Sequence, residues 1–471
     1  MSRRALFTFV VLALALAVLI PYTVKADHRA ENVYLPMVGN SDSGESSVAS
    51  AAAAQQEVDV REQQSSQFAA LAASDHSNKP QSFTPCVQGY AGEFPCHKVD
   101  MLSYVPSSAL GASFINDIWG WTDPETGIDY ALVGSAEGLI VVDIGDPKRP
   151  VVLGILPTAS NTGGPFWRDV KVYANHAFVV SEYDGHGMQV LDLTLVRDVD
   201  LSGGPVVFPE AAYYTGIHHS HNIAINEYTG YAYIVGSESD TETCGGGLHI
   251  VDISDPANPT YAGCFDEHGY SHDTQCVTYH GPDADYYGRE VCFSSNGDVP
   301  GPNTLSIADV TDKSNTIGIS NVSYSDAGYS HQGWLTPDQK YFLHGDELDE
   351  LFLGNNTRTR VWDVSDLDNP TVIGVFDNDT SSIDHNIYAE GRYAFASNYT
   401  SGLRVYDMVD VAAGELSEAA FFDVYPENDN ASFEGGTWSN YPYFAQKGVV
   451  AVTAMDRGLF ILQPRLGKSG N

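Results

Sequence analysis

The stretch Gly138-Leu139-Ile140-Val141-Val142-Asp143 decides the fold, because versions of it recur along the chain. Each version is a short apolar run that ends in aspartate, which is typical of a half-buried β-strand followed by a turn. The steps between successive aspartates are 49, 60, 57, 54 and 44 residues. Self-similarity at this period predicts one four-stranded antiparallel sheet per repeat, and therefore a β-propeller. The other versions end at Asp192, Asp252, Asp309, Asp363 and Asp407, and a seventh, at residues 458–462, lacks the aspartate.

Each repeat contains the signals for four strands. In the second repeat, residues 169–173 and 176–180 alternate as a first and a second strand do, and the run ending at Asp192 is the third. In the first repeat, a turn from Asp146 to Pro150 precedes a fourth strand at 151–156. We expect the recurring aspartate to accept backbone N–H bonds in its turn, which is a structural and not a catalytic role.

The seventh repeat has only three strands, so its fourth must come from elsewhere. Residues 99–105, followed by Pro106, have the pattern of the fourth strands in the other repeats. Pairing them with residues 460–462 would close the ring and remove both sheet edges. The sequence therefore predicts an all-β protein, a seven-bladed β-propeller closed by an N-terminal strand.

The N-terminus has the features of an export signal. Arg3 and Arg4 precede an apolar run at 5–20, and Val24-Lys25-Ala26 has the small residues of a cleavage site. The run is short for crossing a hydrocarbon core of ~30 Å, so we expect cleavage and no membrane span in the mature chain. A stretch rich in Ser, Ala, Gln and Glu follows and indicates a flexible linker. The predicted parts are a signal peptide at 1–26, a low-complexity linker at 27–83, a disulfide loop and closing strand at 84–113, and the propeller at 114–465.

Charge limits the class of partner. The chain has 61 acidic and 23 basic residues and a net charge of −38. Binding to nucleic acid phosphates or to anionic lipid needs clustered Lys and Arg, so this excess argues against both. The six cysteines fit an oxidising, extracellular compartment. Spacing suggests Cys86–Cys96, Cys244–Cys264 and Cys276–Cys292, but six cysteines allow fifteen pairings, so the connectivity stays open.

Polar residues gather where the first strand of each repeat begins and where the second ends. In a propeller both points lie on one rim of the central channel, so topology brings these residues together from distant positions. The pairs at the first strands are Asn116-Asp117, Arg168-Asp169, His221-Asn222, His272-Asp273, His331-Gln332, His385-Asn386 and Trp438-Ser439. The predicted binding residues are Asp117, Asp169, Glu182, Asp273, Gln332, Asp346, Glu347 and Asn386, and the candidate metal ligands are His221, His272, His331 and His385.

Three interpretations of this rim stay open. The imidazoles could hold a transition metal, with carboxylates orienting them. The carboxylate oxygens could hold Ca²⁺ instead, which the acidic rim and export slightly favour. The third interpretation is a solvated polar channel whose groups bond to one another across the blades. Tryptophans near the first strands could form the floor of a carbohydrate or peptide site, although packing between blades is the preferred interpretation. They are Trp119, Trp121, Trp167, Trp334 and Trp438.

Several separate motifs, in order, resemble the secreted LVIVD-repeat proteins of the choice-of-anchor B family. They include Asn116-Asp117-Ile118-Trp119-Gly120-Trp121, His272-Asp273-Thr274-Gln275-Cys276, and His331-Gln332-Gly333-Trp334. The resemblance covers roughly residues 84–465 and implies an exported, surface-associated propeller. It supplies no catalytic residue. Residues 466–471 lack the anchoring tail that such proteins often carry, which favours free secretion.

The preferred function is an extracellular binding or adhesion module that meets a protein, glycan or small-molecule ligand at the polar rim, with a cation to stiffen it. The reason is a repeat scaffold without a nucleophile elbow, a phosphate loop or an HExxH motif. The alternative is a metal-dependent hydrolase or lyase. In that enzyme the four histidines would bind the metal, and Asp273, Glu182 or Glu347 would act as general base. The sequence leaves open whether the chain is an enzyme.

Overall fold

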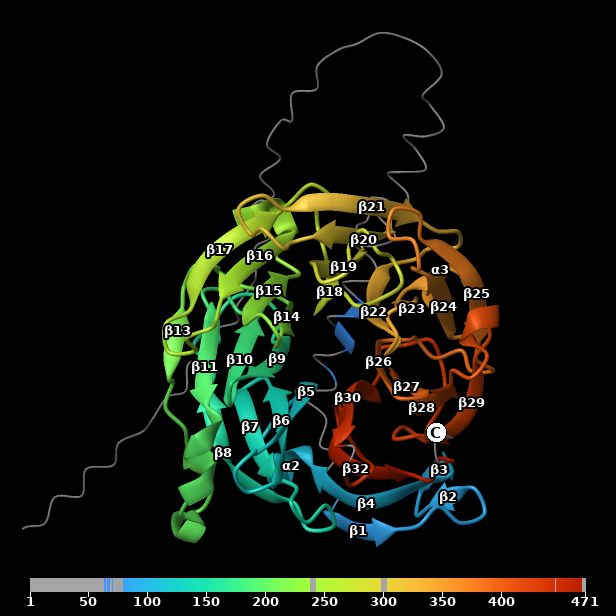
Figure 1. Cartoon of the computed structure of the whole chain (residues 1–471). Coiled ribbons are helices and arrows are strands. Elements are labelled where there is room, and N and C mark those ends of the chain that lie inside the picture. The colour runs from blue at the N-terminus through green and yellow to red at the C-terminus, as the bar shows by residue number, and fades with distance from the viewer. Residues whose placement is uncertain are drawn as a thin grey trace, which may run out of the picture. The chain divides into compact units, whose positions relative to one another are not determined.

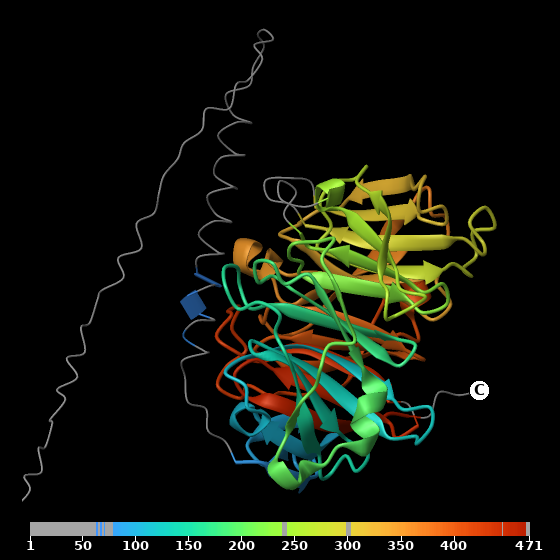
Figure 2. The ribbon, with the colours of Figure 1, turned by 90° about the vertical axis from the view of Figure 1, so that its left-hand side faces the viewer.

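The computed structural model describes residues 63–64, 66–67, 70, 79–237, 243–297, 303–444 and 446–467. The predicted signal peptide and most of the predicted linker lie outside these residues. Seven antiparallel sheets stand around a central channel, and their first strands contact one another in a closed ring (Figure 1). From the side, the strands run along the axis of this ring (Figure 2). The prediction of a seven-bladed, all-β propeller is therefore confirmed.

In blades 1 to 6 the four strands of the repeat follow one another outwards in chain order from the innermost strand. Blades 1 to 3 are β5 (Ile115–Thr122), β6 (Asp129–Ser135), β7 (Gly138–Asp143) and β8 (Val151–Pro157); β9 (Arg168–Tyr173), β10 (His176–Ser181), β11 (Met188–Asp192) and β13 (Ala212–Tyr214); and β14 (Asn222–Asn226), β15 (Tyr231–Val235), β16 (Leu248–Asp252) and β17 (Thr260–Phe265).

Blades 4 to 6 have the same plan. Their strands are β18 (Asp273–Thr278), β19 (Glu290–Asn296), β20 (Thr304–Asp309) and β21 (Ile317–Ser323); β22 (Ser330–Leu335), β23 (Tyr341–Asp346), β24 (Arg358–Asp363) and β25 (Thr371–Asp377); and β26 (Asn386–Glu390), β27 (Tyr393–Asn398), β28 (Gly402–Asp407) and β29 (Ser417–Phe422).

Blade 7 is assembled from both ends of the chain, as predicted. Its inner strands are β30 (Thr437–Phe444), β31 (Val449–Ala454) and β32 (Gly458–Pro464), and its outer strand is β4 (Val99–Pro106). Tyr104 lies opposite Phe460 in the β4–β32 register, and all eight residues of β4 are buried. Earlier residues extend two sheet edges: β1 (Gln81–Thr84) pairs with β4, and β3 (Phe94–His97), which pairs with β2 (Tyr90–Ala91), adds to β29 of blade 6.

The recurring aspartates play the predicted structural role. In all six repeats one carboxylate oxygen accepts a hydrogen bond from the backbone N–H two residues later, which fixes the turn into the fourth strand. The donors are Gly145, Thr194, Ser254, Thr311, Ser365 and Val409.

Blade 2 departs from the repeat because it carries an insertion. Between β11 and β13 the chain forms the 3-10 helices η1 (Leu193–Asp198) and η2 (Leu201–Gly203) and the short strand β12 (Val206–Val207). β12 pairs in parallel with the outer edge of β8 in blade 1. The insertion explains why the step from Asp192 to Asp252 is the longest of the five.

Cross-links and helices complete the described structure. The three disulfides are Cys86–Cys96, Cys244–Cys264 and Cys276–Cys292, as the spacing suggested. The helices are short: α2 (Ser107–Leu110), α3 (Asp349–Leu353), η3 (Thr243–Gly246) and η4 (Val411–Ala413). Within the described ranges, none of the helices has both the length and the apolar character needed to cross a membrane.

Asp423 provides a test of how burial couples the fold to pH. It follows β29, it is buried, and its carboxylate accepts a hydrogen bond of 2.7 Å from the Tyr425 N–H. Burial raises the pKa of Asp423 to about 7. The folded chain then holds a proton here that the unfolded chain releases near pH 4, so stability is lost as the pH rises through 7.

We expect Asp423→Asn to remove this part of the pH dependence. Between pH 5 and pH 8 the wild type should lose about 2–3 kcal/mol of unfolding free energy through this group, and Asp423→Asn should not lose it. Urea unfolding at the two pH values measures the difference. Asp377→Asn, at a half-exposed carboxylate, is the control and should follow the wild type. The same change in unfolding free energy between the two pH values in all three proteins would contradict the prediction.

Candidate functional site

Alternation along the first strands builds a cavity in the central channel. Side chains two positions apart on a strand point the same way, so each inner strand lines the channel with every second residue. The pairs are Asp117 and Trp119, Asp169 and Lys171, Asn222 and Ala224, Asp273 and Gln275, Gln332 and Trp334, and Asn386 and Tyr388. They enclose about 370 Å³. Tyr228 and His280, both exposed, also line the cavity, on the side where the first strands end.

The predicted binding residues divide into two groups. Asp117, Asp169, Asp273, Gln332 and Asn386 line this cavity, whereas Glu182, Asp346 and Glu347 do not. The four histidines precede or begin the first strands and form a separate layer. One rim was expected to gather all of them, but residues next to each other on a strand face different parts of the channel. The channel therefore holds an acidic layer and a histidine layer, one above the other.

A lysine lies among the carboxylates of the cavity. Lys171 Nζ lies 2.5 Å from Asp169 Oδ1 and 3.6 Å from Asp117 Oδ2. Burial would raise the pKa of Asp169, but the Lys171 ammonium and the hydrogen bond from the Ile223 N–H outweigh it and lower the pKa. Burial, then the charge of Asp169, raises the pKa of Asp117 well above its usual range. The same causes raise the pKa of Asp273 to about 7.

Asp117 stands out among these carboxyl groups. Its side chain is buried, and no donor of the described residues lies within 3.5 Å of either oxygen in hydrogen-bonding geometry, although Lys171 is 3.6 Å away and Asp169 and Ser439 lie close enough to influence its pKa. A buried carboxyl group without close hydrogen bonds costs free energy, so its weakly paired oxygens are of interest at the edge of a cavity.

Aromatic rings form one wall of the cavity. Trp334 and Tyr388 meet edge to face with ring centroids 5.0 Å apart, and Trp119 lies 5.8 Å from Tyr388. The ammonium of Lys171 lies 4.6 Å from the centre of the Trp119 ring. The other tryptophans of the predicted group pack away from the cavity: Trp121 stacks on Tyr130, and Trp167 stacks on Trp438. Trp119 and Trp334 thus line the cavity, whereas Trp121, Trp167 and Trp438 pack against other aromatic rings.

The four histidines come from consecutive blades and form a continuous row around the channel. Successive ring centroids are 4.6 Å apart for His221 and His272 and 4.4 Å apart for the next two steps, to His331 and then His385. The row continues to Trp438, 4.5 Å beyond His385. Each of the strands β22 and β30 has a β-bulge near its start, at His331 and at Trp438. The extra residue helps to turn these two side chains towards the channel.

The members of this row have different partners. His221 Nδ1 is hydrogen-bonded to Glu182, and although burial opposes it, this carboxylate raises the pKa of His221. His272 Nδ1 and His385 Nδ1 lie 2.9 and 2.5 Å from the carbonyl oxygens of His331 and Trp438. A carbonyl accepts only, so both rings carry their proton on Nδ1.

Glu347 lies close to two of the histidines, His331 and His385. Its carboxylate lies 3.9 Å from His331 Nε2 and 4.0 Å from His385 Nε2. One donor atom from each of the three lies within 4.8 Å of the other two, and all three side chains are buried. His221 and His272 do not belong to this group, so the candidate metal ligands number two of the four predicted histidines plus Glu347.

Asp346 has a structural role. Its carboxylate accepts hydrogen bonds from the backbone N–H groups of Gly328 and Tyr329 and from Tyr324 Oη, at 2.8, 2.6 and 2.6 Å. Arg360, on β24, lies near it and pairs with Asp349 at 2.8 Å. These bonds hold the connections above blade 5 in place.

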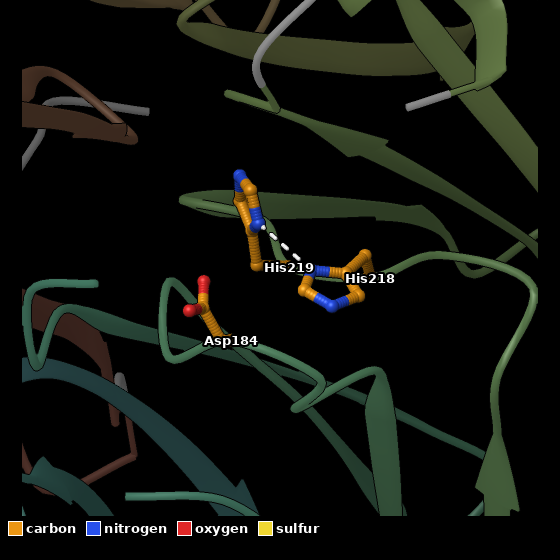
Figure 3. Close-up of side chains that lie close together, drawn as sticks. All are labelled: Asp184, His218 and His219. Atoms are coloured by element: carbon orange, nitrogen blue, oxygen red, sulfur yellow. Dashed lines mark hydrogen bonds between the residues drawn. The ribbon is translucent and has the colours of Figure 1, made fainter. Parts of the chain in front are cut away.

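Sequence reasoning missed another group, formed by Asp184, His218 and His219 (Figure 3). Asp184 lies between β10 and β11, the two histidines lie between β13 and β14, and one donor atom of each residue lies within 4.8 Å of the others. His218 Nδ1 and His219 Nδ1 are 3.3 Å apart. The adjacent histidines were a usable signal, but the position of Asp184 could not be inferred without the fold. A third group, Asp283, Asp366 and Asp368, is largely exposed.

The chain contains LVIVD repeats: this family matches residues 129–158 and 219–267. The first match spans three strands of blade 1, β6 to β8, and the second spans all four strands of blade 3. No match was found among proteins of curated function.

Similar folds occur among solved structures. The RRP9 WD40 repeats are 9% identical with a TM-score of 0.49, over 74% of this chain and 94% of that one. The U3-55K structure is 9% identical with a TM-score of 0.47, over 74% and 95%. A protein from Lactobacillus plantarum is 14% identical with a TM-score of 0.45, over 67% and 84%. The count of seven blades rests on the strand pairings of this chain itself.

Proposed function

We propose that this chain is an extracellular binding module whose central channel takes a small saccharide or the end of a glycan chain. Export would follow from the signal peptide that its first 26 residues predict, and from its resemblance to secreted proteins of the choice-of-anchor B family. The observation that carries the proposal is the cavity itself, whose lining combines carboxyl and amide groups, Asp117 among them, with an aromatic wall.

The chemistry of the lining supports this class of ligand. Carboxyl and amide groups offer many acceptors and several donors on one side, among them Asp273, Asn222 and Gln275, while Trp119 and Trp334 offer an apolar wall. Sugars present hydroxyl groups around a ring with apolar C–H faces, which suits such a mixed lining. The volume of about 370 Å³ lies within the usual range for small-molecule sites.

Ligand-observed NMR with a panel of mono- and disaccharides, followed by titration of tryptophan fluorescence, tests the proposal. We expect Asp117→Leu to weaken binding at least tenfold, because it replaces a hydrogen-bonding group by an apolar one of similar size. Asp184→Leu, outside the cavity, should bind as the wild type does. Absence of any saccharide binding, or equal binding by Asp117→Leu, would count against the proposal.

A second candidate function is a metal-dependent hydrolase or lyase. It is favoured by the approach of His331, His385 and Glu347 within one buried group. Glu182 is engaged by His221 and Glu347 belongs to the group, so Asp273 remains as the carboxylate that could accept a proton from a bound water. Hydrolysis of ester or glycoside reporters that disappears after metal removal would support this function over simple binding.

A further inference from the structure

We propose that His331, His385 and Glu347 form a binding site for one divalent transition ion of the zinc class. The proposal goes beyond saccharide binding, because none of the three residues lines the cavity. They come from neighbouring blades: His331 is on β22, Glu347 follows β23 of the same blade, and His385 precedes β26 of the next.

The donor set fits such an ion. Two imidazole nitrogens and one carboxylate are a common ligand set of catalytic zinc and of related transition ions, whereas Ca²⁺ prefers oxygen ligands alone. Around a tetrahedral ion with bonds of about 2.1 Å, ligand atoms lie about 3.4 Å apart. The two imidazole nitrogens lie 3.9 and 4.0 Å from Glu347 and within 4.8 Å of each other, so an ion would require each side chain to shift inwards.

The groups around the ligands orient them. His385 donates Nδ1–H to the Trp438 carbonyl, which leaves the lone pair of Nε2 on the side of Glu347. Tyr399 Oη donates a hydrogen bond of 2.7 Å to Glu347 Oε1. Such contacts fix the tautomer and the direction of metal ligands in known sites.

His331 supplies an independent observation. The ring is buried, and its Nδ1 has no hydrogen-bond partner among the described residues. Its Nε2 faces Glu347 at 3.9 Å, and no hydrogen bond of Nδ1 fixes the tautomer, so the ring can offer the lone pair of Nε2 to an ion beside Glu347.

Calorimetric titration of the chelator-stripped full chain with Zn²⁺ tests the site, with Co²⁺ absorption as a second readout. We expect one equivalent of Zn²⁺ to bind and Co²⁺ to give the visible bands of a four-coordinate ion. His331→Asn should weaken Zn²⁺ binding at least about 100-fold. Glu347→Gln, which keeps an acceptor for Tyr399, should weaken it at least about tenfold. Circular dichroism of each variant confirms that the propeller is folded.

The surface group of Figure 3 provides the matched control. A His218→Asn/His219→Asn double variant removes two imidazoles that do not belong to the proposed site and should bind Zn²⁺ as the wild type does. Loss of binding in this control, with binding kept in His331→Asn, would overturn the proposal. So would the absence of stoichiometric binding, or preference for Ca²⁺ over Zn²⁺. Saccharide binding by the metal-free chain is measured separately, so either proposal can fail alone.

Discussion

A chain that lacks residues 1–106 will fail to form a stable propeller, whereas one that lacks residues 1–78 keeps every described strand and will melt close to the full chain, having lost the hydrogen bond that Gln67 Oε1 accepts from the Phe433 N–H. β4 supplies the outer strand of blade 7, and five of its apolar side chains are buried: Val99, Met101, Leu102, Tyr104 and Val105. At roughly 1.5–3 kcal/mol for each such side chain, their loss is about 10 kcal/mol, comparable with the whole stability of a typical domain. Soluble yield and thermal melting by circular dichroism measure the difference.

A point substitution tests the same contact at full length. Tyr104 stacks on Phe460 with ring centroids 4.4 Å apart and donates a hydrogen bond to the Arg457 carbonyl. Tyr104→Asp places an unpaired charge in this core and should destabilise the chain by at least about 3 kcal/mol. Phe83→Asp, at an exposed position of the neighbouring β1, should change stability by less than about 1 kcal/mol. Similar melting of both variants would show that β4 is dispensable.

The second large effect concerns Arg360. This side chain is 2% exposed, and it donates to Asp349 and to the Asp326 carbonyl while its guanidinium lies 4.7 Å from the centre of the Tyr324 ring. Other buried carboxyl groups lie nearby, namely Asp346, Glu350 and Asp384. Removing one partner of a buried ion pair costs about 3–5 kcal/mol, because the other charge is left without compensation. We expect this loss for Arg360→Met in urea unfolding.

Arg358 is a close control for this change. It is on the same strand, two residues earlier, but its side chain is partly exposed and lies 3.9 Å from the half-exposed Asp377. A surface pair of this kind contributes about 0–1 kcal/mol, so Arg358→Met should be nearly neutral. Equal destabilisation by the two substitutions would mean that burial of the Arg360 pair is not what matters.

Most of the fold could be predicted because it follows from local patterns. The number of recurring apolar runs predicted the number of blades, and their spacing predicted four strands in each. The aspartate at the end of a run predicted the turn that follows. The closing strand was predictable because the seventh repeat lacked a fourth strand and residues 99–105 had the right pattern. The insertion with β12 was visible only as a longer step, since a two-residue strand has no pattern of its own.

The site was predictable in composition but not in arrangement. The sequence identified the polar residues at the start of each first strand, and five of the predicted binding residues line one cavity. It did not separate the histidine layer from the acidic layer, because neighbouring residues on a strand face different parts of the channel and the position of His331 also depends on a bulge. Nor could it choose between Glu182 and Glu347 as the partner of His331 and His385, since the choice depends on which side chains meet across blades.

The origin of blade 7 from both ends of the chain constrains how the protein can be made. Residues 99–106 leave the ribosome early, and their partner at 458–464 is among the last segments to be synthesised. During that interval an apolar strand is uncovered, and an uncovered edge invites aggregation. The local hairpin of β2 and β3 with its Cys86–Cys96 cross-link can form at once, but the ring cannot. A product of premature termination would therefore lack the partner of β4 and would be left for proteases to remove.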